Sequence, residues 1–102
     1  MNYSVQLMDK KKFPEEQRCA IEQRYSHALA QHLGGPEQVL PAHRAWVNAK
    51  TRQDETPGAD ISLGEKKAIQ HWEHAEVAAR LLAFEGYTGA LEDLYIEVKP
   101  CP

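Results

Sequence analysis

The stretch SLGEKKAIQHWEHAEVAARLLAFE, residues 62–85, carries the strongest helix signal in the chain. It opens with a capping box: the Ser62 hydroxyl can accept a hydrogen bond from an early amide, while the Glu65 side chain reaches back to the helix start. No proline interrupts the stretch, and Gly86 follows it as a stop signal. We therefore predict one helix from Ser62 to about Glu85.

At about 100° per residue, this predicted helix has two apolar sides. One side is formed by Ala68, Trp72, Ala75, Ala78, Ala79 and Leu82, and the other by Leu63, Val77, Leu81 and Phe84. A helix that is apolar on two sides needs two packing partners. The second partner is either more of the same chain or another subunit. We expect a homodimer, with Val77, Leu81 and Phe84 at its interface. Glu76 and Arg80 have the four-residue spacing of a modest surface pair.

The two ends of the chain have the pattern of β-strands. Tyr3, Val5 and Leu7 alternate with polar residues near the N-terminus, and Leu94, Ile96 and Val98 do so near the C-terminus. A period of two is typical of a half-buried strand.

Two more helices are predicted between the first strand and residue 62. The first runs from Pro14 to Leu33, where Gly34-Gly35 ends it. The second begins near Pro41, after a short turn over 36–40, because a proline deep inside a helix would remove a hydrogen bond. It ends between Lys50 and Arg52, and the polar segment 51–60 is predicted to be a loop.

The element order is therefore β-α-α-α-β, which predicts a single α+β domain over residues 1–102. Its hydrophobic fraction of 42% supports a packed core. The three helices pack with a small sheet formed by the N- and C-terminal strands. Because an isolated pair of strands is marginal in water, either the helices cover one face or a second chain extends the sheet in a dimer.

The segment QHWEHAE, residues 70–76, places two histidines and two carboxylates within seven residues. His71 and His74 are three apart, but the next turn of the helix offers no third ligand. The zinc-protease pattern, with two histidines four apart and an adjacent glutamate, is absent. We interpret the segment as a packed helix with Trp72 directed inward and Glu73 and Glu76 in water.

A wider group of histidines raises a second hypothesis. His32, His43 and His71 each lie on the apolar side of a different predicted helix, so packing of the helices could bring them together to hold zinc or a carboxylate ligand. Alternatively, each histidine is satisfied separately by a hydrogen bond within the chain. With Tyr25, Trp46 and Trp72 they define a candidate ligand pocket. No metal or cofactor is predicted outright.

Composition argues against several partners. The formal charge of −3 and the long loop before residue 62 argue against a nucleic-acid partner. No apolar run approaches a membrane span, and the N-terminus lacks the apolar core of a signal peptide. The two cysteines, Cys19 and Cys101, are most simply free thiols. We therefore expect a cytoplasmic protein.

We interpret the chain as a small interaction or adaptor protein that acts through a homodimer or a partner-binding surface. That surface is the second apolar side of the last helix or an exposed strand edge. The rival hypothesis is a small-ligand or metal-binding protein, enzymes included, which uses the helix-borne histidines in an apolar pocket. No sequence motif for catalysis is present, so we do not expect an enzyme, and no catalytic residue is predicted.

Overall fold

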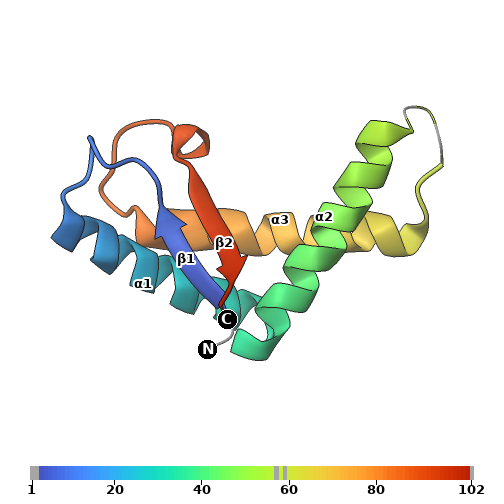
Figure 1. Cartoon of the computed structure of the whole chain (residues 1–102), viewed down its shortest axis with the longest axis horizontal. Coiled ribbons are helices and arrows are strands. Elements are labelled where there is room, and N and C mark those ends of the chain that lie inside the picture. Colours follow the sequence, from blue (N-terminus) through green and yellow to red (C-terminus); the bar gives the residue numbers. More distant parts are fainter. Residues whose placement is uncertain (1–2, 57, 59, 102) are drawn as a thin grey trace.

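The computed structural model describes residues 3–56, 58 and 60–101 of the chain. The fold is α+β, and its strands and long helices follow the predicted order β-α-α-α-β (Figure 1). The elements are β1 (Tyr3–Leu7), α1 (Glu15–Leu33), a 3-10 turn η1 (Pro36–Gln38), α2 (Val39–Glu55), α3 (Leu63–Ala83), a second 3-10 turn η2 (Leu91–Asp93) and β2 (Ile96–Pro100).

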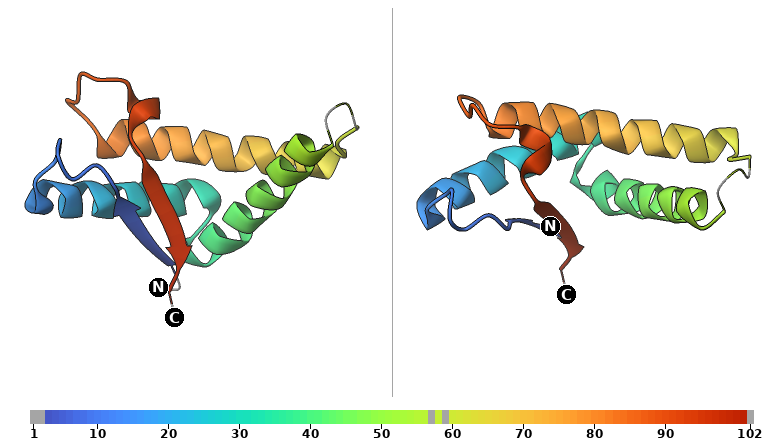
Figure 2. Two further views of the ribbon diagram at one scale, coloured as in Figure 1. Left: turned by 45° about the horizontal axis from the view of Figure 1, so that its top comes forward. Right: turned by 90° about the horizontal axis from the view of Figure 1, so that it is seen from above.

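The two strands form one antiparallel sheet, in which Val5 lies opposite Val98 and Leu7 lies opposite Ile96. The predicted alternation is confirmed in β1, where Tyr3 and Leu7 are buried and Ser4 is exposed. The right-hand view of Figure 2 shows the strands on one side of the helices. The helices therefore cover one face of the sheet, which provides the packing that two strands alone lack.

Helix α1 begins and ends close to the predicted positions. Pro14 is its N-cap rather than its first residue, and Gly34 ends it in the left-handed conformation at φ 96°. The Gly34 amide donates to the carbonyl oxygens of Ala30 and Gln31, which have no amide donor within the helix itself. A glycine adopts this conformation without the steric cost that a Cβ atom imposes.

Helix α2 is longer than predicted at both ends. It starts at Val39, so Pro41 is its third residue. The first four amides of a helix have no intrahelical acceptor, so a proline at this position removes no hydrogen bond. The prediction of an end near Lys50–Arg52 was wrong, because the helix continues to Glu55. The last turn of the helix is polar and exposed, so it carries no apolar pattern that would have predicted it. In this turn Arg52 forms an ion pair with Glu65 at 3.1 Å.

Helix α3 is the element on which the others pack. Its capping box is confirmed: the Glu65 amide donates to the Ser62 hydroxyl at 3.1 Å, and the Ser62 amide donates to the Glu65 carboxylate at 3.1 Å. Helix α1 lies along its C-terminal half and α2 along its N-terminal half (Figures 1 and 2). Its alanine-rich side supplies core residues, of which Trp72, Ala75, Ala79 and Ala83 are buried.

One hydrophobic core joins all the long elements, with Leu29 of α1, Val39 of α2, Ala79 of α3 and Leu94 before β2 almost completely buried. This continuity agrees with a single small domain. Within the described residues, no helix has both the length and the apolar character needed to cross a membrane.

Candidate functional site

An open recess lies where α2, α3 and β2 meet. It has a volume of about 380 Å³ and is lined by Tyr25, His43, Trp46, Trp72, Glu73, Glu76, Val77, Arg80, Ile96 and Val98. We call it the aromatic recess. Four of the six residues predicted to form a ligand pocket meet here, namely Tyr25, His43, Trp46 and Trp72.

The other two predicted pocket residues, His32 and His71, line a separate shallow pocket together with His74. The three predicted histidines therefore do not share one pocket, and among the described residues no cluster of three or more histidine, cysteine or acidic side chains could hold a metal ion. His32 was expected on the apolar side of α1, but it is exposed, and its Nδ1 lies 2.8 Å from the Ala28 carbonyl oxygen. It belongs to the last turn of α1, in which Ala30 and Leu33, rather than His32, face the core.

Three aromatic rings form the wall of the aromatic recess. The His43 ring meets Trp72 edge-on at 4.9 Å between centroids, and the Trp46 and Trp72 rings are 6.2 Å apart. Trp72 is buried, whereas Trp46 and His43 are half-buried and reach the opening. Partial burial lowers the pKa of His43 from its ordinary value of 6.5, so its imidazole is neutral at pH 7.

A network of polar groups closes the floor of the recess. The Tyr25 hydroxyl donates to the Glu76 carboxylate at 3.3 Å, and Glu76 pairs with Arg80. Burial, followed by the negative charge of Glu76, raises the pKa of Tyr25, which stays protonated. The prediction that Glu76 and Arg80 form a pair is confirmed. The prediction that this pair lies on the surface was wrong, because the Glu76 side chain is only 22% exposed and the Arg80 side chain 16%.

Arg80 also ties the C-terminal segment to α3. Its Nη1 donates to the carbonyl oxygens of Leu91 at 2.6 Å and Leu94 at 2.7 Å. The guanidinium thus bonds to one carboxylate and two carbonyls, and it joins α3 to the segment that leads into β2.

Glu73 lies at the rim of the recess and is exposed. One of its carboxylate oxygens accepts a hydrogen bond from the Trp46 indole Nε1 at 3.3 Å. Among the ion pairs formed by the described residues, none includes Glu73. The sequence prediction placed Glu73 in water and missed its role beside Trp46, because that contact joins two helices.

The outer side of α3 continues the recess with exposed apolar side chains. Val77 lines the recess and is 55% exposed, and Leu81 is 60% exposed. Leu81 and Leu91 border an adjoining hollow that shares Glu76, Val77 and Arg80 with the recess. We call the aromatic recess together with Val77 and Leu81 the recess face.

Phe84 was predicted to lie on this surface with Val77 and Leu81, but it is 4% exposed and belongs to the core. The helix ends at Ala83, so the helical rotation of 100° per residue does not predict the direction of the Phe84 side chain. Its ring lies 5.8 Å from Phe13 and 6.2 Å from Tyr87 between centroids. The exposed part of the predicted interface is therefore Val77 and Leu81.

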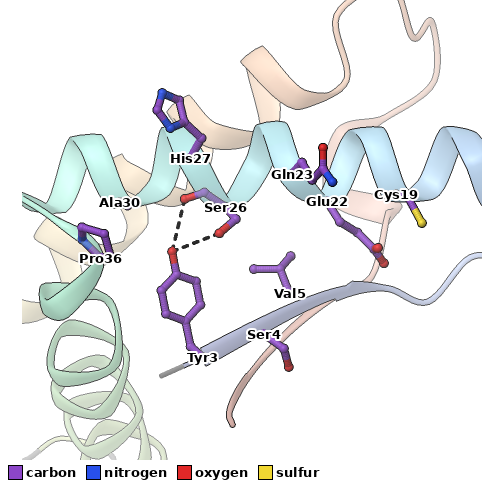
Figure 3. A pocket seen from close by; sticks show the side chains of 10 residues that line it. All are labelled: Tyr3, Ser4, Val5, Cys19, Glu22, Gln23, Ser26, His27, Ala30 and Pro36. Atoms are coloured by element: carbon purple, nitrogen blue, oxygen red, sulfur yellow. Dashed lines mark hydrogen bonds between the residues drawn. The ribbon is translucent and has the colours of Figure 1, made fainter. Parts of the chain in front are cut away.

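A second open surface lies at the opposite edge of the sheet, along β1. Figure 3 shows this strand groove between β1 and α1, with Val5 lying between the two elements. It has a volume of about 380 Å³ and is lined by Tyr3, Ser4, Val5, Cys19, Glu22, Gln23, Ser26, His27, Ala30 and Pro36. The Tyr3 hydroxyl lies 3.0 Å from the Ser26 hydroxyl, and the Leu7 amide donates to the Glu22 carboxylate at 2.7 Å.

The hydrogen-bond pattern of the sheet determines which backbone groups face this groove. The Met8 amide donates to the Tyr95 carbonyl at 3.0 Å, which makes these residues a hydrogen-bonded pair in the register of the sheet. Antiparallel strands alternate between hydrogen-bonded and non-hydrogen-bonded pairs. The backbone groups of Tyr3 and Val5 therefore point outward from β1, as do those of Ile96 and Val98 from β2.

The recess face and the strand groove both combine open apolar surface with hydrogen-bonding groups. Either arrangement suits the binding of a partner. Comparisons of this chain with models of protein families, with curated proteins and with solved structures found no match.

Proposed function

We propose that this chain is a small interaction domain that binds a segment of a partner protein through the recess face. One observation carries the proposal: Val77 and Leu81 are each more than half exposed beside a recess walled by tryptophan side chains. Aromatic side chains in open pockets act as anchoring sites in protein interfaces.

The polar groups at the floor of the recess support this function because they are already hydrogen-bonded within the chain. Tyr25 and Arg80 both bond to Glu76, and Arg80 also donates to two carbonyls. Such a site does not need to rearrange before binding, which reduces the free-energy cost of association.

The extent of the apolar surface favours a short segment as the occupant. A stable interface buries about 800 Å² on each partner. Val77 and Leu81 are separated from Leu63, the other exposed apolar residue on this side of α3, by polar residues that include Gln70 and His74. The continuous apolar surface on this side of α3 is therefore limited to the recess and its rim, which suits a peptide segment.

A randomised peptide library selected on the immobilised domain tests this function. We expect the selected peptides to lose binding to the double variant Val77→Asp/Leu81→Asp. The control is Leu63→Asp, which adds one such charge to an exposed leucine of the same helix outside the recess face. Peptides that bind the double variant and the control equally would rule out the recess face.

A homodimer through the strand groove is a second candidate, favoured by the outward-facing backbone groups of Tyr3 and Val5. Antiparallel pairing of β1 with β1 of a second copy would create a sheet in the order β2-β1-β1-β2. Because the Leu7 amide is already bonded to Glu22, this pairing would centre on Ser4. A free strand edge of this kind readily accepts another strand.

The dimer is tested by native mass spectrometry together with one pair of variants. Ser4→Lys would place two like charges at the centre of the pairing, and we expect it to produce a monomer. Gln6→Lys is the matched control, because Gln6 is an exposed β1 residue two positions from that centre. A monomer before any substitution would exclude this dimer at the concentration tested.

We also propose that the domain works in the cytoplasm. The support is chemical: Cys19 and Cys101 are both free and both exposed. Exposed free thiols persist in a reducing compartment and are readily oxidised outside it.

A further inference from the structure

We propose that the aromatic recess receives a lysine or arginine side chain of the partner segment, with the aliphatic stem against Trp46 and the cationic group beside Glu73. This inference rests on the proposed function and specifies the chemistry of the partner.

The first argument is the charge of the recess. Arg80 neutralises Glu76, so this pair adds no net charge to the floor. His43 contributes no positive charge at pH 7 because its burial favours the neutral imidazole. Glu73 is then the remaining charge, and none of the ion pairs formed by the described residues involves it. A recess with one uncompensated carboxylate is complementary to a single cation.

The second argument is the position of Glu73 relative to the rings. Its hydrogen bond from Trp46 Nε1, at 3.3 Å, holds the carboxylate at the edge of the indole. A cation bound there meets the carboxylate and the π-system of the half-buried indole together. Lysine and arginine both bind over tryptophan faces, and arginine also forms bidentate bonds to carboxylates.

The third argument is the apolar lining. Val77, Ile96 and Val98 line the same recess. Lysine and arginine carry aliphatic stems that pack on apolar surface while their charged ends stay near water. The lining therefore suits a long cationic side chain better than a compact inorganic cation.

The chain has only two tryptophans, Trp46 and Trp72, and both line the recess, so their indole NH signals in a nitrogen–proton NMR spectrum report on this site. The probes are N-acetyl-lysinamide and N-acetyl-argininamide, and N-acetyl-norleucinamide is the uncharged control. We expect the cationic probes to shift the Trp46 signal in a saturable manner and the control to leave it unchanged. Equal shifts with the control, or none with the cationic probes, would overturn the proposal.

Substitution of the carboxylate provides the second test. Glu73→Gln keeps the shape and a hydrogen-bond acceptor for Trp46 but removes the charge, so we expect the affinity for the cationic probes to fall by about 3- to 10-fold. Glu85→Gln, which removes an exposed carboxylate beyond the end of α3, should leave the affinity unchanged. Equal affinities for both variants would overturn the role of Glu73.

The peptide selection separates this inference from the proposed function. We expect the peptides that require Val77 and Leu81 to be enriched in lysine or arginine at one position. Peptides that require these residues but show no such enrichment would overturn the inference and leave the function standing. Binding of the cationic amides without any selected peptide would overturn both the function and a protein side chain as the ligand, and would identify a free small cation instead.

Discussion

Arg80 pairs with Glu76 one turn earlier on α3 and, through the same guanidinium, donates hydrogen bonds to the carbonyl oxygens of Leu91 and Leu94. One side chain thus joins the helix to the segment that becomes β2. The Leu91 carbonyl also accepts the Leu94 amide within η2, whereas the Leu94 carbonyl lies between η2 and β2, outside both elements. Arg80 therefore supplies a donor to the segment that links the two elements.

Arg80→Met is expected to lower the free energy of unfolding by about 2–4 kcal/mol, because it leaves Glu76 without its counter-ion and removes the Arg80 donor from the Leu91 and Leu94 carbonyls. Urea denaturation followed by circular dichroism measures the change. Arg44→Met is the control: Arg44 is an exposed arginine of α2, and its substitution should change stability by less than about 0.5 kcal/mol. A similar small change for Arg80→Met would show that the network does not stabilise the fold.

Phe84 and Leu81 provide a contrast between core and surface. Phe84→Ala should destabilise the domain by about 3–5 kcal/mol, because the ring packs against Phe13 and Tyr87 in the core. Leu81→Ala, three residues earlier, should cost less than about 1 kcal/mol because the side chain is 60% exposed. Thermal denaturation of the two variants compares them directly. Equal losses of stability would contradict the placement of Leu81 on the surface.

The capping box of α3 makes a measurable contribution to stability. Ser62→Ala removes the acceptor for the Glu65 amide and should cost about 1 kcal/mol. Glu65→Ala removes the reciprocal bond to the Ser62 amide. Since the two bonds form one motif, the double variant should lose less stability than the sum of the single losses. Strictly additive losses in urea denaturation would show that the two bonds act independently.

His43 makes stability depend on pH in a defined direction. Its pKa is lowered in the folded domain by burial, so the unfolded chain binds this proton more readily. The free energy of unfolding should therefore decrease as the pH falls through 6.5, the ordinary value, towards the lower pKa of the folded state. In His43→Gln this contribution should be absent. Urea denaturation at pH 7.5 and pH 5.5 tests the difference, and identical pH dependence of the two proteins would contradict the burial of His43.

Local sequence patterns correctly predicted the elements of the fold. The Ser62 and Glu65 capping box, the Gly34 stop signal and the alternation around Val5 act through hydrogen bonds and side-chain directions within a few residues. The end of α2 was misplaced because its polar last turn carries no apolar signal, although an exposed turn of helix needs none.

The candidate site was predicted only in part, because four of the six predicted pocket residues share the aromatic recess. Helical periodicity placed Trp72, Ala75 and Ala79 on the inward face of α3, although Leu82 on the same predicted side is 51% exposed. It also identified Tyr25, His43, Trp46 and Trp72, which share one recess. It could not separate His32 and His71 from His43, because periodicity gives the direction of a side chain around its own axis and not the side on which a neighbouring helix lies.

The sequence alone therefore determined which segments become helices and strands, since capping and periodicity are local properties of the chain. The tertiary structure alone decided which side chains meet. Phe84 joined the core because the chain turns after Ala83, and Arg80 reached Leu91 and Leu94 because β2 returns across α3. Glu73 and Trp46, 27 positions apart, became neighbours only when α2 packed against α3, and contacts of this range depend on the packing of whole elements.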